Sequence, residues 1–240
     1  MLPRILVIQI RNPDDAMLEH ERRCFAERCE LPLENTLVHN AVTTAPPPTA
    51  FKEYDAVMVG GSGDYSVVNK PFPYIDQTMD FIMETINARV PFFGSCMGFQ
   101  MVSKAMGATV ITDEPNREVG TYELTLTPEG CEDPLFGKLP KTFHAHLGHT
   151  DRVETAPPGA RHLASSKKCG YQAFQIGDGP AYCTQFHPEL DKKSNQERYD
   201  FYVNQHKVSG GKLGYPATDA EFLALDPPVN LLKEFIDAFV

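Results

Sequence analysis

The sequence predicts an α/β fold in which a mostly parallel central sheet is flanked by helices and carries a mixed or antiparallel extension. Two observations support this prediction. Up to Gly107, short apolar runs alternate with longer helical patterns, which is typical of a parallel sheet. Beyond Gly107, apolar runs follow one another through short connections, which favours antiparallel pairing. These later expected strands are residues 108–112, 119–127, 142–147, 160–165, 171–176 and 181–186.

The N-terminal part contains two apolar runs that suit central strands covered on both faces. Residues 4–10 are apolar and β-branched nearly throughout. Residues 54–60 form the second run, which leads into a glycine-rich turn at residues 60–64, Gly-Gly-Ser-Gly-Asp. Between the two runs, residues 14–30 are expected to form a helix, with Pro13 near its start.

A helix, a strand and a second helix follow in the next part of the chain. Residues 73–88 carry apolar side chains at helical spacing, which predicts an amphipathic helix. Residues 90–95 then predict a strand and residues 96–106 a helix, with Gly107 where a C-cap belongs. The apolar positions of the first helix are Ile75, Met79, Ile82 and Ile86.

After Pro188 the chain becomes polar and helical in pattern. We expect one domain over residues 1–240, in which a core at residues 4–190 carries the motifs and residues 191–240 form a helical extension. From the sequence, this extension either covers a pocket or forms a surface for a homo-oligomer. Its expected helices are residues 191–206, 218–224 and 228–240.

Composition argues against several classes of protein. The 240 residues carry a formal net charge of −10, whereas a nucleic-acid-binding surface needs a basic patch, so we expect no nucleic-acid partner. The six cysteines are scattered without C-x-x-C spacing. The sequence shows no basic-then-apolar leader and no apolar stretch near the roughly 20 residues of a membrane span. We therefore expect a cytoplasmic protein with no membrane partner.

Residues 90–100, Val-Pro-Phe-Phe-Gly-Ser-Cys-Met-Gly-Phe-Gln, carry the most informative motif. An apolar strand ends in a Gly-x-Cys-x-Gly turn from which a helix starts, the pattern of a nucleophile elbow with cysteine in place of serine. Gly94 and Gly98 allow the backbone to turn tightly beneath Cys96, and the helix N-terminus stabilises a thiolate there. Cys96 is therefore predicted to be a covalent nucleophile rather than a buried structural cysteine.

A nucleophilic cysteine needs a base within hydrogen-bond reach and a third group that orients the base. Among the eight histidines, His187 has the most informative context, because Phe-His-Pro-Glu follows an expected strand. Side chains two residues apart project to the same side of a strand, so Glu189 is expected beside His187. Pro188 denies the next ladder bond and helps to end the strand.

Together these motifs resemble the class I (triad) glutamine amidotransferase family, which includes the glutaminase domain of GMP synthase. Gly-x-Cys-Met-Gly-x-Gln, the later Phe-His-Pro-Glu and the Gly-Gly-Ser-Gly-Asp turn occur in the family's order over roughly residues 4–190. The resemblance implies a flavodoxin-like class I glutamine amidotransferase fold. It also implies hydrolysis of the glutamine γ-carboxamide through a glutamyl thioester to ammonia and glutamate, a reaction that needs no metal and no organic cofactor.

The resemblance assigns a role to each matching residue. Cys96 would be the nucleophile, His187 the acid and base, and Glu189 the orienting carboxylate. The backbone N–H groups of Met97 and of the Gly61 region would form the oxyanion hole, and residues 148–151 would hold the amino-acid end of the substrate. The implied oxyanion and substrate-binding residues are Gly60, Gly61, Gly63, Met97, Gln100, Thr150 and Asp151.

The sequence leaves several alternatives open. The substrate is glutamine or another γ-glutamyl compound, since γ-glutamyl peptides and γ-glutamyl amines share the same carbonyl chemistry. The family usually delivers ammonia to a synthase domain, and no such domain follows residue 190, so we expect either an ammonia-accepting synthase subunit or a free hydrolase. A non-catalytic, regulatory relative is the alternative of another class, and the presence of all three triad residues argues against it.

A few further residues lie near the expected pocket. His144, His146 and His149 are close in sequence, but no nearby Cys, Asp or Glu pattern completes a metal site, so a polar rim or core role is expected. Position 95 is serine where the family more often has an apolar residue. Glu118 lies in a strand that is expected to border the pocket, and the sequence assigns it no role.

Overall fold

The computed structural model of the chain describes residues 2–209, 220–225 and 230–240. Its main sheet is made of β1 (Ile5–Ile10), β2 (Thr36–Asn40), β3 (Ala56–Ser62), β4 (Phe92–Ser95), β6 (Glu118–Leu126), β7 (Thr142–His149), β9 (Ala160–Ser166), β10 (Ala173–Ile176) and β11 (Ala181–Thr184). A separate pair consists of β5 (Val110–Thr112) and β8 (Asp151–Val153). The α-helices are α1 (Met17–Cys29), α2 (Ile75–Asn87), α3 (Met97–Ala105), α4 (Pro128–Glu132), α5 (Lys192–Ser209) and α6 (Leu231–Phe239). Short 3-10 helices are η1 (Leu33–Asn35), η2 (Ala50–Glu53), η3 (Glu114–Asn116) and η4 (Phe136–Lys138).

The main sheet has the strand order β2-β1-β3-β4-β11-β10-β9-β6-β7. The first five strands in this order run parallel to one another. β11 pairs directly with β4, and Thr184 lies opposite Ser95 in the register. Because the carboxyl ends of parallel strands meet at one edge of a sheet, the residues that follow β4 and β11 are brought together there.

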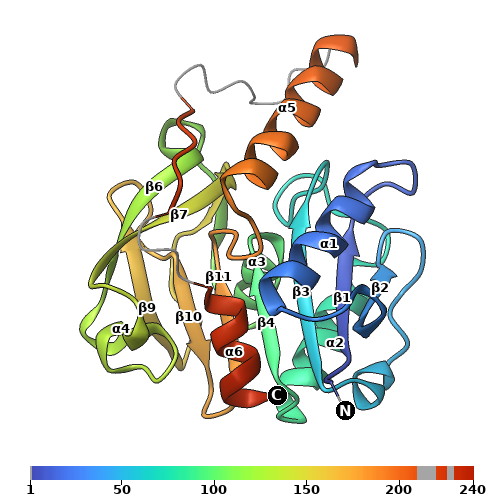
Figure 1. Ribbon diagram of the computed structural model, residues 1–240, viewed down its shortest axis with the longest axis vertical. Helices are drawn as coiled ribbons and strands as arrows, with labels where there is room; N and C mark the ends of the chain where they lie inside the picture. Colours follow the sequence, from blue (N-terminus) through green and yellow to red (C-terminus); the bar gives the residue numbers. More distant parts are fainter. Residues whose placement is uncertain (1, 210–219, 226–229) are drawn as a thin grey trace.

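The remaining four strands extend the same sheet in antiparallel fashion (Figure 1). β6 and β7 pair from Glu118 opposite His149 to Thr125 opposite Thr142. This pairing places the end of β7 beside the start of β6, near the edge at which β4 and β11 end. The arrangement confirms the predicted fold class, a parallel sheet flanked by helices with an antiparallel extension.

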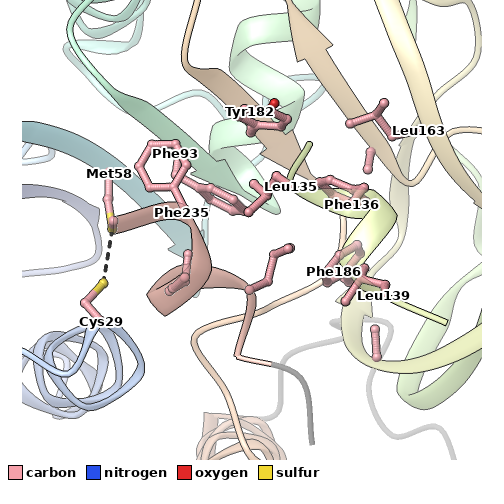
Figure 2. Packing of buried hydrophobic residues seen from close by; sticks show 14 of the residues in the cluster. Cys29, Met58, Phe93, Leu135, Phe136, Leu139, Leu163, Tyr182, Phe186 and Phe235 are labelled. Carbon is pink, nitrogen blue, oxygen red and sulfur yellow. Dashed lines mark hydrogen bonds between the residues drawn. The ribbon is translucent and has the colours of Figure 1, made fainter. Parts of the chain in front are cut away.

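Hydrophobic cores lie on both faces of the sheet. α1 and α6 cover one face, whereas α2 and α3 pack against each other on the opposite face. Figure 2 shows the first of these cores, in which Phe93 of β4 meets Phe235 of α6 edge to face at 5.4 Å between ring centroids. Tyr182 of β11 also contacts Phe235, at 6.2 Å. Burying such a ring contributes roughly 1.5–3 kcal/mol, so β4 and β11 are held rigidly against α6.

Several elements differ from the sequence-based expectations. β2, β8 and α4 are additional, and the expected strand at residues 108–112 is only β5, which belongs to the separate pair. α1 begins at Met17 rather than at residue 14, because Asp15 first forms a turn with Asn12 and its side chain accepts from the Met17 N–H. Within the described ranges, no helix combines the length and apolarity that crossing a bilayer requires.

The expected helix at residues 218–224 is wrong where the structure describes it, since residues 220–225 are not helical. The N–H of Thr121 donates to the Glu221 carbonyl at 2.7 Å, and the Leu223 N–H donates to the Thr121 hydroxyl at 3.0 Å. Gly120, with φ of 119°, permits this approach, because a Cβ there would lie 2.7 Å from the Glu221 oxygen. The segment therefore runs beside β6 (Figure 1). Residues 218–219 and 228–229 lie outside the described residues.

Candidate active site

Cys96 occupies a strained turn between β4 and α3. Its backbone has φ of 50° and ψ of −94°, which is unusual for a residue other than glycine, and its N–H donates to the Thr184 carbonyl at 2.7 Å. A Cβ on Gly98 would lie 2.9 Å from both the Cβ and the carbonyl oxygen of Val59. A Cβ on Gly94 would lie 3.0 Å from the Gly98 carbonyl carbon. The tight turn beneath Cys96 therefore requires both glycines, as expected.

His187 and Glu189 form a buried pair just beyond β11. The Nδ1 atom of His187 lies 2.7 Å from Oε1 of Glu189. The strand ends at Thr184, earlier than expected, and the pair sits in the turn that follows it. The His187 N–H donates to the His146 carbonyl at 2.8 Å and ties this turn to β7. The expected pairing is thus present, but a turn rather than the alternation of a strand produces it.

Charges around His187 stabilise its protonated form. Burial disfavours the imidazolium, but Glu189 and Cys96 outweigh burial and raise the pKa of His187 to about 9. Burial likewise disfavours the charged carboxylate of Glu189, yet His187 and Arg198 hold the pKa of Glu189 well below its usual range. The pair therefore favours a protonated imidazole held against an ionised carboxylate.

A cavity of about 160 Å³ opens beside Cys96. We call it the Cys96 cavity. It lies between the turn after β3, the start of α3 and the turn between β7 and β8. Of the residues predicted to bind substrate, Gly63, Met97, Gln100, Thr150 and Asp151 line it. The structure thus gathers five predicted positions from three separate elements around one space.

Gly60 and Gly61 do not line the Cys96 cavity but lie behind its wall. A Cβ on Gly61 would lie 2.8 Å from Cε1 of His187, so Gly61 packs directly against the imidazole. A Cβ on Gly60 would lie 2.6 Å from Oε1 of Glu21, a fully buried carboxylate that pairs with Arg11 at 2.8 Å. These glycines therefore allow close packing around His187 and Glu21.

Two buried amide side chains connect Cys96 to the cavity wall. The Gln185 amide donates to Sγ of Cys96 at 3.6 Å. The Gln100 amide donates to the Gln185 side-chain oxygen at 3.2 Å and to the Asp151 carbonyl at 2.9 Å. Gln100 thus lines the cavity as expected, while its amide nitrogen is already bound by protein.

Sequence reasoning missed Arg198, which lies on α5 beside the His187–Glu189 pair. Its Nη1 atom donates to Oε1 of Glu189 at 3.2 Å and lies 3.5 Å from Nδ1 of His187. The side chain is buried. No motif marks Arg198, because it is one of several charged residues in a polar helical pattern, and only the docking of α5 brings it to Glu189.

Glu118 and His149 form a second buried polar group beneath the Cys96 cavity. The Glu118 carboxylate lies 3.0 Å from Nε2 of His149 and accepts from Gln172 at 2.6 Å and from Ser166 at 2.7 Å. The Nδ1 atom of His149 lies 3.1 Å from the Asp151 carbonyl. The group therefore supports the turn that carries Thr150 and Asp151, a role that the sequence did not assign to Glu118.

The three neighbouring histidines do not converge. His144 is exposed, His146 is buried with Nδ1 3.1 Å from the Thr121 hydroxyl, and His149 contacts Glu118. Within the described ranges, no group of three or more His, Cys, Asp or Glu is placed to hold a metal ion. Ser95 is buried and does not line the Cys96 cavity, and its hydroxyl has no hydrogen-bond partner among the described residues.

Comparisons with known proteins agree with this geometry. The model of the family described as glutamine amidotransferase class-I matches residues 21–203. A subunit of the glutamine-hydrolyzing GMP synthase from Sulfolobus acidocaldarius is 32% identical over 170 residues, which are 70% of this chain and 84% of that protein. The GMP synthase of Thermosipho africanus is 34% identical over 139 residues, which are 58% of this chain and only 25% of that protein.

Solved structures share the fold at low sequence identity. A glutamine amidotransferase from Methylobacillus flagellatus is 20% identical with a TM-score of 0.71, and the match covers 100% of this chain and 93% of that one. A glutamine amidotransferase from Thermotoga maritima is 23% identical with a TM-score of 0.65, over 88% and 86% of the two chains. These likenesses confirm the predicted fold.

Proposed function

The chain belongs to the class I glutamine amidotransferase family, and on that premise we propose that it hydrolyses the γ-carboxamide of glutamine. Cys96 is the nucleophile, His187 the general acid and base, and Glu189 the carboxylate that orients His187. The observation that carries this proposal is the strained Cys96 turn beside the buried His187–Glu189 pair. Covalent amide hydrolysis requires a nucleophile, a base that contacts it and a third group that orients the base.

In the first half of the proposed reaction, Cys96 replaces the amide nitrogen. The thiolate adds to the γ-carbonyl carbon, and the carbonyl oxygen takes the negative charge. The N–H groups of Met97 and of the Gly61 region stabilise this oxyanion, and losing one such donor typically costs about 3 kcal/mol of transition-state stabilisation. His187 then gives its proton to the nitrogen as the carbon–nitrogen bond breaks, so ammonia leaves and a glutamyl thioester remains.

In the second half, water replaces Cys96. Neutral His187 takes a proton from a water molecule, which adds to the thioester carbonyl. Collapse of the second tetrahedral intermediate breaks the carbon–sulfur bond, releases glutamate and returns the thiolate beside a protonated His187. Glu189 stays ionised throughout and holds the ring so that its other nitrogen faces Cys96.

The Cys96 cavity is the proposed site for the glutamyl group. Gln100, Thr150 and Asp151 lie along its wall and Gly63 at its edge, so the amino-acid end of the substrate would lie against the turn between β7 and β8. The fate of ammonia is a further proposal. Relatives named as subunits of glutamine-hydrolyzing GMP synthase suggest a synthase partner that accepts ammonia, and a free hydrolase is the alternative.

Ammonia release from glutamine, combined with covalent labelling, tests this function. We expect the wild-type chain to release ammonia and to be modified at Cys96 by acivicin, used as a glutamine-mimicking electrophile. The Cys96→Ala variant should do neither. Equal labelling of this variant would show that the nucleophile is wrong, and an unlabelled, inactive wild type would favour a non-catalytic role.

A further inference from the structure

Gln185 is a buried glutamine whose side chain contacts the sulfur of Cys96. It follows β11 directly, it is fully buried, and its backbone N–H donates to the Gln172 carbonyl at 2.8 Å. Its Nε2 atom lies 3.6 Å from Sγ of Cys96. The backbone N–H of Cys96 donates to the carbonyl of Thr184, the residue before Gln185, at 2.7 Å. The main chain and the side chain of Cys96 are therefore both in contact with the end of β11.

The neighbouring amide of Gln100 determines which end of the Gln185 side chain faces the sulfur. A carbonyl oxygen can only accept, so the end of Gln100 that lies 2.9 Å from the Asp151 carbonyl must be its nitrogen. The same nitrogen lies 3.2 Å from one end of the Gln185 amide, which must therefore be the oxygen. The nitrogen of Gln185 is the end that remains to face Cys96. A main-chain carbonyl thus fixes the polarity of both amides.

A donor that faces Sγ stabilises negative charge on the sulfur. A thiol sulfur is a weak acceptor, whereas hydrogen bonds with an ionised partner are roughly twice as strong as those between neutral groups. Gln185 is fully buried and Cys96 is 8% exposed, so little water competes for this N–H. Among the described residues, Sγ is the one acceptor that the Gln185 side-chain nitrogen meets. The contact is therefore placed to stabilise a thiolate.

We propose that Gln185 is a further catalytic residue, which stabilises the anionic sulfur of Cys96 through its side-chain N–H. This inference rests on the proposed function and adds a residue to it. The sulfur is negative before it attacks the γ-carbonyl and again when the carbon–sulfur bond of the second tetrahedral intermediate breaks, whereas it carries no charge in the thioester. Gln185 stays neutral and transfers no proton, so every proton transfer remains with His187. Its N–H is a fixed donor for the charge that leaves and returns to the sulfur.

Alkylation of Cys96 by iodoacetamide, in the absence of substrate, tests the contact. The thiolate is the form that reacts, and the exposed Cys131 on α4 provides an internal reference in the same molecule. Gln185→Met keeps the length of the side chain and removes the N–H. We expect the rate of labelling at Cys96 relative to Cys131 to fall about three- to tenfold, because the lost hydrogen bond lowers the thiolate population while the remaining thiolate becomes more nucleophilic.

Gln175→Met is the matched control. Gln175 is also a buried glutamine, on β10, and its side-chain nitrogen donates to the Gly179 carbonyl at 2.9 Å instead of to Cys96. We expect this variant to keep the wild-type labelling ratio, and circular dichroism shows whether each variant is folded. If Gln185→Met does not fold, Gln100→Met takes its place, because it removes the donor that holds the oxygen of Gln185 and allows the amide to turn. The labelling ratio should then fall about threefold.

Pre-steady-state kinetics with glutamine separates the two halves of the proposed reaction. Loss of the N–H makes the thiolate a poorer leaving group, so the second tetrahedral intermediate expels it more slowly. Acylation suffers less, because a less stabilised sulfur is the stronger nucleophile. We expect Gln185→Met to lower kcat about tenfold and to accumulate the glutamyl thioester on Cys96, which mass spectrometry of the quenched enzyme detects. A purely structural role for Gln185 would lower the rate without this accumulation.

The possible outcomes separate this inference from the proposed function. If the wild type hydrolyses glutamine through Cys96 but folded Gln185→Met keeps the wild-type labelling ratio, the role of Gln185 is wrong and the proposed function stands. A lower kcat without added thioester also overturns the role of Gln185, as does an unchanged ratio in Gln100→Met where that variant replaces it. If the wild type neither hydrolyses glutamine nor is labelled at Cys96 by acivicin, both proposals fail together.

Discussion

The Cys96 cavity and a second cavity of about 50 Å³, which His187 lines and which we call the His187 cavity, share Ser62, Gly63 and Gly148 in their walls but differ in the other elements around them. Strand ends and tight turns surround the first, at the end of β3, at the elbow before α3 and at the turn after β7. Side chains of α5 and Phe222 line the second, together with residues of β6 and β7 and Arg11 after β1. Tight turns contribute most to the first cavity, whereas large side chains of α5 contribute to the second. We therefore expect substitutions around the two cavities to have different effects on activity and stability.

His187 is the general acid and base of the proposed reaction, so its loss should have the largest effect. We expect His187→Gln to lower kcat by about 10⁴-fold, because neither thiol activation nor protonation of the leaving group remains. Steady-state ammonia release measures this. The control is His144→Gln, an exposed histidine on β7 that should retain the wild-type rate. A His187→Gln enzyme with a tenth of normal activity would contradict the assignment.

Arg198 connects α5 to the His187–Glu189 pair. Substituting it tests whether α5 contributes to the proposed reaction as well as lining the His187 cavity. Arg198→Met should lower kcat by about 10- to 100-fold, because it leaves the buried Glu189 without its cation. Arg198 helps to keep the pKa of Glu189 low, so the acid limb of the kcat/KM profile should move to higher pH. Arg198→Lys should restore part of the rate. A lower rate with an unmoved pH profile would indicate a purely structural role.

A substitution at Gly98 tests the tight turn at the Cys96 cavity. Gly98→Ala forces a Cβ to within 2.9 Å of Val59, and such overpacking typically costs about 1–3 kcal/mol of the free energy of unfolding. Urea denaturation measures the loss. Gly179→Ala is the control, because nothing lies within 4 Å of the added atom. Equal stability of the two variants would show that the elbow has room to relax.

The pH dependence of stability gives the smallest expected effect. The pKa of His187 is raised from 6.5 to about 9 in the folded chain, so protonation favours folding. This stabilisation is complete below about pH 6.5 and is lost as the pH rises toward 9. The free energy of unfolding should fall less steeply over that window in His187→Gln. In Cys96→Ala the fall should end at lower pH, because Cys96 is one of the groups that raise this pKa.

The Cys96 turn and the His187–Glu189 pair were predictable because their local geometry restricts the sequence. A positive φ at Cys96 with helix and strand packed against it leaves room only for glycine at positions 94 and 98. His187 and Glu189 are two residues apart, so no distant contact is needed to bring them together. The central strands were predictable for a similar reason, since burial on both faces demands continuous apolar runs such as β1.

Other elements and contacts could not be predicted from a local sequence pattern. β2 is a short edge strand with Val38 exposed and few apolar residues, so only its pairing with β1 defines it. Residues 220–225 have a pattern compatible with helix, but hydrogen bonds to Thr121 hold them beside β6 in another conformation, and Gly120 permits the close approach. Glu118 and His149 meet because β6 pairs with β7 in one register.

The sequence by itself determined the parallel sheet, the Cys96 elbow and the local His187–Glu189 pair, because each depends on residues near one another in the chain. The tertiary structure alone decided that β11 pairs with β4, which sets His187 beside Cys96. It also decided that α5 places Arg198 on Glu189 and Asn195 at the His187 cavity. Such contacts depend on how elements dock, and many different side chains satisfy the same docking, so no local pattern records them.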